Sequence, residues 1–237
     1  MEETKVKAIV IGGIDYKEKD KLVNLFTLEQ GIQTVVFKGV KSANAKLKSA
    51  KELFSFGDFI YTGGNNKVVT SADIIQSFYG LTKNLKKYYT GCAILDIIKT
   101  VLPEGEQNPQ LFVITLKCLG LLLQDEVDNY MVLNKFLISI FKGVGYSFDV
   151  NFCNNCGEKL RERRFINLMH GDVTCSLCRA GSFIQLSMPV ASALRLISNT
   201  DEDKLTTLKI QRETLISTFN ILSANFEYRF NKKILNV

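Results

Sequence analysis

The sequence Cys-Asn-Asn-Cys occupies positions 153–156, and after 18 intervening residues Cys-Ser-Leu-Cys occupies positions 175–178. Two Cys-x-x-Cys pairs at this separation are typical of a site in which four thiolates surround one zinc ion. Gly157, directly after the first pair, suits a knuckle whose backbone turns tightly. Residues 164–168 are strand-like and lead to a Gly171-Asp172 turn. The sequence therefore predicts a small zinc-bound hairpin whose ligands are Cys153, Cys156, Cys175 and Cys178.

Other roles for the four cysteines fit the sequence less well. Two disulfides are an alternative, but nothing at the start of this sequence resembles a signal peptide, so a reducing, cytoplasmic compartment is expected. A redox Cys-x-x-Cys pair usually occurs alone beside a βαβ unit. A catalytic zinc needs an open coordination position, which four sulfurs do not leave. Structural zinc is the prediction, with disulfides or a lost site as the alternatives.

The composition is that of a globular protein with a modest basic excess. The chain has 237 residues, of which 46% are hydrophobic, enough for one large domain or two smaller ones. No apolar run reaches about 18 residues, so no membrane span is expected. The net charge is +6, and 23 of the 30 basic residues are lysine. Because lysine suits phosphates better than base edges, any nucleic-acid partner is expected to be bound without regard to sequence.

Short alternating segments in the first 80 residues predict a small β-barrel, because closure removes exposed strand edges. Gly12-Gly13 is expected to end the first strand, before a charged loop at residues 15–21. Turn sequences at residues 29–31 and 63–66 support two hairpins. The expected strands are Lys5–Ile11, Leu22–Leu28, Ile32–Phe37, Phe54–Tyr61 and Lys67–Ile75.

Lysines cluster in the connection between the third and fourth expected strands. Residues 38–51 contain five lysines and no acidic residue. The simpler interpretation of such a run is a solvated loop. The functional interpretation is electrostatic binding of a phosphate backbone. Aromatic residues able to stack on bases are sparse, and each fits strand or core packing better: Tyr16, Phe37, Phe56 and Tyr61.

From about Leu81 the hydrophobic period changes to three or four residues, which predicts helices. Three helices are expected between residues 81 and 145, packed as an antiparallel bundle. The second begins at Asn108-Pro109, where asparagine caps and proline takes the first helical position. Two more follow the cysteines, after Ser187 and over about residues 206–230. The zinc module, residues 150–182, is therefore predicted as an insertion in a helical domain (81–237) that follows the barrel domain (1–80).

The sequence contains no recognisable catalytic constellation. It has no phosphate-cradling Gly-x-x-x-x-Gly-Lys-Ser/Thr loop, no nucleophile elbow and a single histidine, His170, which is expected in a turn. Glu104 and Glu106 lie beside Pro103 and Gly105 and fit a solvated link. A binding protein is therefore predicted, and not an enzyme.

The order of these parts resembles the bacterial RecO family of recombination mediators over nearly the whole chain. The resemblance is carried by short segments that follow one another in the family's order and spacing. They are Val6–Gly12, Asp15–Leu22, Glu29–Gly31, Phe37–Lys41, Asn108–Phe112, Gly145–Phe148, Cys153–Gly157 and Phe230–Leu235.

The resemblance implies an α+β fold, in which an N-terminal OB-fold barrel precedes a helical-bundle domain with an inserted four-cysteine zinc module. It also implies a non-enzymatic mediator that binds single- and double-stranded DNA and anneals complementary strands. The implied partners are RecR, the C-terminal tail of single-strand-binding protein and, indirectly, RecA, in the cytoplasm at the nucleoid. A zinc-ribbon accessory factor of transcription or translation is the alternative function.

The charge pattern, together with the resemblance, gives the candidate site residues. The family's loop after the third strand is often rich in arginine, whereas this one is rich in lysine, and all four zinc positions are cysteine here. Arg161, Arg163 and Arg164 in the zinc hairpin form a second candidate patch for DNA. The main candidates for DNA contact are the lysines of the first charged loop and of the next long connection: Lys17, Lys19, Lys21, Lys38, Lys41, Lys46, Lys48 and Lys51.

Overall fold

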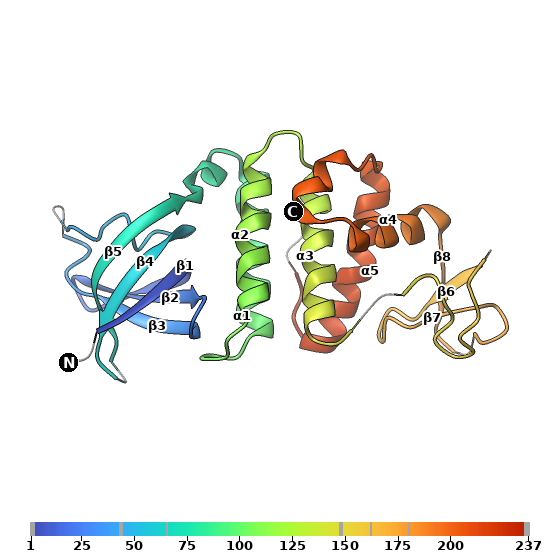
Figure 1. The fold of residues 1–237 in the computed structure, drawn as a ribbon, viewed down its shortest axis with the longest axis horizontal. Helices are drawn as coiled ribbons and strands as arrows, with labels where there is room; N and C mark the ends of the chain where they lie inside the picture. Colours follow the sequence, from blue (N-terminus) through green and yellow to red (C-terminus); the bar gives the residue numbers. More distant parts are fainter. Residues whose placement is uncertain are drawn as a thin grey trace. The chain divides into compact units, whose positions relative to one another are not determined.

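The computed structural model describes residues 3–42, 45–64, 66–146, 149–161, 163–179 and 181–234 (Figure 1). Asn65, Ser147, Phe148 and Leu235, which belong to the turn and family-like segments of the sequence, lie outside the described residues. The chain forms two compact units, Met1–Leu123 (unit 1) and Gln124–Val237 (unit 2). Among the described residues, no helix has the length and apolar character that crossing a membrane requires.

Unit 1 is built on a closed five-stranded barrel with the strand order β1-β2-β3-β5-β4. Its strands are β1 (Glu3–Tyr16), β2 (Asp20–Thr27), β3 (Gly31–Phe37), β4 (Ser55–Thr62) and β5 (Val68–Ser77). Neighbouring strands are antiparallel except β3 and β5, which are parallel and pair at Val36 and Val68. This arrangement confirms the small barrel predicted from the strand pattern and is consistent with the OB-fold that the resemblance implies.

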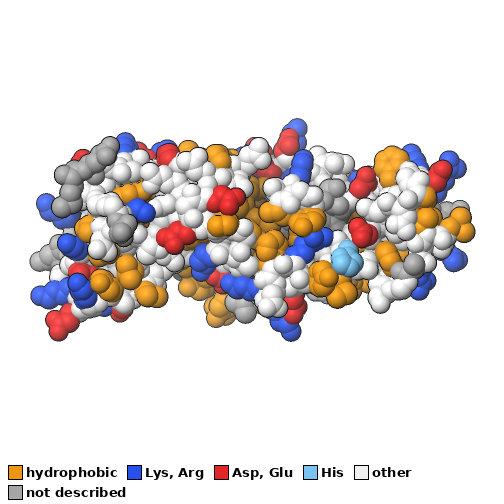
Figure 2. Space-filling view, turned by 90° about the horizontal axis from the view of Figure 1, so that it is seen from below, with side chains coloured by type: hydrophobic (Ala, Val, Ile, Leu, Met, Phe, Trp, Pro, Cys, Tyr) orange, Lys and Arg blue, Asp and Glu red, His pale blue; other side chains and the backbone are white. Residues whose placement is uncertain are grey.

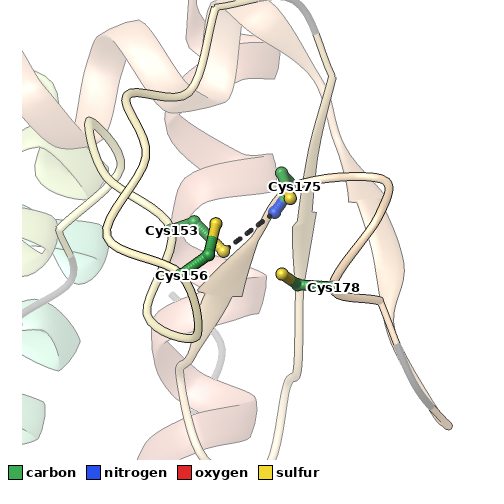
Figure 3. Close-up of side chains that lie close together, drawn as sticks. All are labelled: Cys153, Cys156, Cys175 and Cys178. Carbon is green, nitrogen blue, oxygen red and sulfur yellow. Dashed lines mark hydrogen bonds between the residues drawn. The ribbon is translucent and has the colours of Figure 1, made fainter.

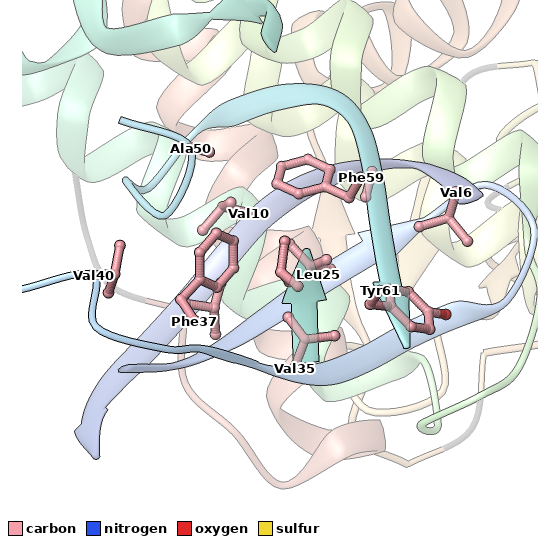
Figure 4. Close-up of a cluster of buried hydrophobic side chains, with 12 residues drawn as sticks. Val6, Val10, Leu25, Val35, Phe37, Val40, Ala50, Phe59 and Tyr61 are labelled. Carbon is pink, nitrogen blue, oxygen red and sulfur yellow. The ribbon is translucent and has the colours of Figure 1, made fainter. Parts of the chain in front are cut away.

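Alternate residues of the strands fill the barrel interior, as the pleat of a strand requires (Figure 4). Leu25, Phe37 and Phe59 are fully buried there, and the Phe37 and Phe59 rings meet edge to face at 6.4 Å. Tyr61 is buried as well, and its hydroxyl is hydrogen-bonded to the side chain of Gln30. Phe37 and Tyr61 are thus packing residues, as expected.

The first strand is longer than predicted. It continues through Gly12 and Gly13 to Tyr16, with a bulge between Val10 and Gly12. A Cβ at Gly13 would lie 2.8 Å from the Leu22 carbonyl oxygen, so glycine allows the close pairing with β2 to continue. The prediction that the glycines end the strand was wrong, and the charged residues 15–21 lie at the end of a long hairpin.

Two helices and their links complete unit 1. A short 3-10 helix, η1 (Phe78–Lys83), leads from β5 into α1 (Leu85–Val101), and α2 (Pro109–Leu123) follows. The Phe112 ring of α2 lies 5.3 Å from that of Phe26 and packs the helix against the barrel. Asn108 caps α2 as predicted, because its side chain accepts a hydrogen bond from the Leu111 N–H (2.9 Å).

Gly31, at the start of β3, is expected to tolerate no side chain. Its φ is +65°, and a Cβ there would collide with the backbone of Glu106 in the link between α1 and α2. Gly39 has nearly the same φ, +64°, but its Cβ would meet nothing within 4 Å. Gly31→Ala should lower the free energy of unfolding by about 3 kcal/mol or more, and the control Gly39→Ala by only about 1–2 kcal/mol. Denaturant titrations measure both values, and equal losses would contradict the steric argument.

The described residues of unit 2 form three α-helices, a 3-10 helix and a small sheet. The helices are α3 (Asn129–Gly143), α4 (Met188–Asn199) and α5 (Arg212–Phe230), with the 3-10 helix η2 (Glu202–Thr207) between the last two. The sheet has the order β7-β6-β8 and consists of β6 (Arg164–Ile166), β7 (Val173–Thr174) and β8 (Ile184–Leu186). It lies between α3 and α4 in the chain, so the zinc module is inserted among helices, as predicted.

The helices of unit 2 pack against one another, α3 against both α4 and α5. Lys135 of α3 is buried and donates to the Thr200 carbonyl (2.6 Å), just past the end of α4, and its ammonium lies 3.4 Å from Glu202. By contrast, α1 and α2 belong to unit 1. The sequence groups these two helices with α3, whereas the helices of unit 2 are α3, α4 and α5. An apolar stripe shows which face of a helix is buried but not which element covers it.

Candidate metal centre and nucleic-acid interface

The four cysteines of the two pairs come together in the zinc module (Figure 3). Their Sγ atoms all lie within 4.8 Å of one another. Zinc–sulfur bonds of about 2.3 Å in a tetrahedron place the sulfurs about 3.8 Å apart. The spacing and the all-sulfur donor set therefore fit one structural zinc ion, held by Cys153, Cys156, Cys175 and Cys178.

The backbone around the first pair has the turn that a metal-binding knuckle needs. The Gly157 N–H donates to the Cys153 carbonyl (2.9 Å), and Gly157 has a left-handed φ of +73°. Across the site, the Cys175 N–H donates to Sγ of Cys153 (3.4 Å), the bond drawn dashed in Figure 3. The second pair thus also orients a ligand of the first pair.

The thiols of Cys153 and Cys178 differ in acidity. Burial opposes ionisation of Cys153, but the backbone N–H groups of Cys156, Cys175 and Asn155 stabilise the thiolate and lower its pKa to about 6. Hydrogen bonds with the thiols of Cys156 and Cys175 raise the pKa of Cys178 to about 12. Because zinc binds thiolates, metal binding must displace the Cys178 proton, and affinity should fall as the pH is lowered.

Asn154 joins the two halves of the site. Its backbone N–H donates to the Val173 carbonyl (2.8 Å), and its side-chain oxygen accepts from the Val173 N–H (2.8 Å). Val173 lies on β7, two residues before Cys175. These two hydrogen bonds hold the first knuckle beside the second, so they bring the two sulfur pairs within reach of one ion.

Asn154→Ala is expected to weaken metal binding without removing a ligand. Loss of a hydrogen bond that supports metal ligands typically lowers affinity by about 10–100-fold. Asn155→Ala is the matched control, because the Asn155 side chain makes a longer bond, to the Cys178 carbonyl (3.4 Å). Competition with a chromophoric zinc chelator measures both affinities, and an equal effect of the two substitutions would contradict the role assigned to Asn154.

The zinc module is hydrogen-bonded to the rest of unit 2. Arg164 donates to the carbonyls of Val150 and Leu160 (both 2.8 Å), so its guanidinium supports the fold, while Arg161 and Arg163 are exposed. On α5, the buried Asn225 donates to the Met169 carbonyl (2.9 Å) in the turn between β6 and β7. His170 lies in this turn, as expected, and is not part of the ligand cluster.

The structure brings the two lysine-bearing segments of the barrel together. The Lys41 N–H donates to the Lys19 carbonyl (3.1 Å), and the Gly39 N–H donates to the Asp20 carboxylate (2.8 Å). Val40 and other buried residues of the loop after β3 anchor it in the barrel core. Residues 39–41 of the loop therefore lie against residues 19–20 of the hairpin tip. The lysines of the two segments are named here the lysine surface: Lys17, Lys19, Lys21, Lys38, Lys41, Lys46, Lys48 and Lys51.

The lysines of this surface differ in how their charges are compensated. Lys41 pairs with Asp15 (3.0 Å), and Lys51 pairs with Glu52. The other six make no ion pair with any described residue, and all of these except the half-buried Lys21 are exposed. Figure 2 shows basic side chains spread over the barrel end of the view, at its left. The sequence of unit 1 contains no arginine, so its basic surface consists of lysine alone.

Tyr16 lies at the end of β1, beside the lysine surface. Strand or core packing was expected for it, but its side chain is not buried: 38% of the residue is exposed. The Lys17 ammonium lies 5.2 Å from the centre of its ring. The sequence signal for this position was its charged neighbours, Asp15 and Lys17, which do not belong in a barrel interior.

Comparison with known proteins identifies relatives along the whole chain. A family model described as "Recombination protein O N terminal" matches residues 1–78, and "Recombination protein O C terminal" matches residues 82–235. A protein named "DNA repair protein RecO" from Clostridium novyi is 24% identical over 230 residues, which is 97% of this chain and 90% of that protein. Its namesake from Clostridium perfringens (strain 13) is 26% identical over 226 residues, 95% of this chain and 92% of that protein. The namesake from Syntrophomonas wolfei is 27% identical over 206 residues, 86% of this chain and 80% of that protein.

Proposed function

The chain belongs to the recombination protein O (RecO) family, whose curated relatives are DNA repair proteins, and we propose that it acts in DNA repair as a recombination mediator. In this proposal the OB-fold barrel binds single- and double-stranded DNA and anneals complementary strands. Unit 2, with its zinc module, provides docking surfaces for other proteins. The role is one of binding and not of covalent catalysis.

The observation that carries the proposal is the contact between the two lysine-bearing segments of the OB-fold. Six of them make no ion pair with any described residue, and the hairpin and loop that carry them are hydrogen-bonded to each other. An ammonium group is a compact charge that attracts phosphates and does not discriminate between bases. Sequence-independent binding suits an annealing protein, because such a protein must act on any pair of strands.

Annealing requires that two polyanions approach each other. A strand held on the lysine surface has part of its charge neutralised and has released counterions, so a second strand meets less repulsion. A zinc ion bound to the four cysteines would supply a cross-link that keeps the module folded. The module in turn is hydrogen-bonded to α5 through Asn225.

RecR, single-strand-binding protein and, indirectly, RecA are the proposed protein partners. A cavity of about 280 Å³ in unit 2 supports a site for the acidic, apolar tail of single-strand-binding protein. Ile138, Val150 and Leu194 form apolar parts of a lining that is otherwise mostly polar, and Lys142 and Arg195 outnumber Asp149, its one acidic residue. Such a lining fits a peptide that carries both apolar side chains and carboxylates.

Annealing of complementary strands coated with single-strand-binding protein tests the function. The purified protein should accelerate duplex formation from coated strands, and less so when the coating protein lacks its C-terminal tail. Naked complementary strands serve as the control for annealing itself. If the protein accelerates annealing of neither coated nor naked strands, the proposal is rejected. A factor of transcription or translation would instead bind RNA polymerase or the ribosome.

A further inference from the structure

In unit 1, β5 leads through η1 into α1 (Figure 1), and this segment carries lysines and tyrosines. No acidic residue occurs between Asp73 and Asp96. Within this stretch the side chains of Tyr79 and Tyr89 are exposed, with 63% and 47% of each residue accessible. We name Tyr79, Lys83, Lys86 and Tyr89 the tyrosine–lysine patch.

The lysines of this patch are electrostatically uncompensated. Lys83 and Lys86 are exposed and make no ion pair with any described residue. Lys86 also lies in the first turn of α1, which has no acidic residue, although the positive end of the helix dipole disfavours cations there. Lys87 differs, because its ammonium lies 3.5 Å from the Leu123 carbonyl at the end of α2. A bound polyanion would compensate Lys83 and Lys86, for which the described residues provide no ion-pair partner.

The helix end itself does not need an anion. The Asn84 side chain accepts hydrogen bonds from the N–H groups of Lys86 (3.0 Å) and Lys87 (3.2 Å) and so caps α1. A ligand of this patch would therefore contact the lysine ammonium groups and the exposed rings. This requirement fits an extended chain of phosphates and bases better than a free phosphate ion.

The ring of Tyr89 packs against other aromatic rings of unit 1. Its ring lies 5.7 Å from that of Tyr88, which in turn meets the ring of Phe54 edge to face at 6.0 Å. Phe54 is fully buried in unit 1. Because Tyr89 rests on this fixed support, less conformational freedom is lost when a flat ligand stacks on it.

The tyrosine–lysine patch follows directly on the end of the loop that carries the lysine surface. The Phe78 N–H donates to the Phe54 carbonyl (3.2 Å), and Ser55 pairs with Ser77 at the start of β4. The Ser55 hydroxyl also donates to the Ser49 carbonyl (3.0 Å), next to the lysines of that loop. The last residues of the lysine loop and the start of η1 are thus hydrogen-bonded neighbours.

We propose that single-stranded DNA bound on the lysine surface continues onto the tyrosine–lysine patch, where Tyr79 and Tyr89 stack on bases and Lys83 and Lys86 contact phosphates. The inference rests on the proposed function, because it extends the same nucleic-acid path. Exposed rings beside cations are the usual means of holding single strands without sequence preference. A stretch without acidic residues also disfavours a basic protein partner.

Photo-crosslinking tests the path directly. An oligonucleotide of about 30 nucleotides that contains 5-iododeoxyuridine is irradiated with the full-length protein, and the attached peptides are identified by mass spectrometry. Crosslinks at Tyr79 or Tyr89 together with crosslinks around residues 16–51 are the expected result. Crosslinks around residues 16–51 alone would overturn the inference and leave the proposed function intact. The absence of any crosslink on unit 1 would reject both the inference and the proposed function. If the patch instead serves a protein partner, its tyrosines would give no crosslink to DNA.

Variants give the size of the contribution. Tyr79→Ala combined with Tyr89→Ala should weaken binding of the same oligonucleotide by about 30-fold or more, whereas the Phe variants should bind like the parent because they keep the rings. Lys83→Ala with Lys86→Ala should lower the slope of log affinity against log salt by about 1.4. Circular dichroism checks that each variant is folded. Parental affinity in the double Ala variant of the tyrosines would overturn the inference.

Discussion

Replacing Cys153 with serine is expected to abolish zinc retention and to destabilise unit 2. Cys153 is buried and accepts a hydrogen bond from the Cys175 N–H, so it links the two knuckles as well as binding metal. Zinc-binding free energy in small modules is folding free energy, and apparent values reach about 10–16 kcal/mol. A loss of about 3 kcal/mol or more from the free energy of unfolding is therefore expected. Metal analysis after dialysis and calorimetric melting measure the two effects.

Cys92→Ser is the matched control for this experiment. Cys92 lies on α1 in unit 1 and is not part of the ligand cluster. This variant should retain one zinc ion per chain and the melting behaviour of unit 2. A parent protein that binds no zinc, or a Cys153→Ser protein that melts like its parent, would contradict the prediction.

The combined replacement of Lys17, Lys19, Lys46 and Lys48 with alanine is expected to have the largest effect on DNA binding. All four are exposed and make no ion pair with a described residue, so their loss removes charge without leaving a buried acid unpaired. Each lysine that contacts a phosphate contributes about 0.7 to the salt slope for single strands, which gives about 2.8 for four contacts. At low salt the affinity should fall by about 100-fold for every sequence tested.

Exposed lysines of unit 2 provide the control for the change in net charge. Lys204, Lys209, Lys232 and Lys233 are exposed, and their replacement with alanine removes the same number of charges. Fluorescence anisotropy with labelled single strands over a range of salt concentrations gives affinity and slope for both variants. Equal effects of the two quadruple variants would mean that net charge, and not the lysine surface, governs binding.

The parts of the fold that local chemistry determines were predictable from the sequence. The spacing of the cysteine pairs and the Asn108-Pro109 helix start depend on neighbouring residues, and both appear in the structure as expected. The extension of β1 through Gly12 and Gly13 depends on the close approach of β2. The residues of β1 alone do not reveal that approach. The partners of α3 were missed for the same reason, because they lie far along the chain.

The candidate site divides in the same way. The four sulfurs were predictable because each pair is local, whereas the support that Asn154 receives from Val173 depends on the pairing of the two knuckles. The lysines were visible as a run, but the bond between Lys41 and Lys19 depends on the barrel. Tyr79 and Tyr89 carry no sequence signal that separates them from Tyr88, which is packed against Phe54.

The closed order of the barrel strands has a consequence for synthesis of the chain on a ribosome. β1, β2 and β3 can pair with one another as soon as they leave the ribosome. The edge of β1 that pairs with β4, and the edge of β3 that pairs with β5, remain unpaired until those later strands are synthesised. Unpaired edges of this kind favour pairing between nascent chains, and lysines along an edge oppose it. Lys5 and Lys7 lie in the part of β1 that later pairs with β4. In the closed barrel their ammonium groups lie 3.2 and 2.7 Å from the Asp58 carboxylate of β4. The same two ammonium groups would thus oppose aggregation of the incomplete barrel, and in the closed barrel they form ion pairs between β1 and β4.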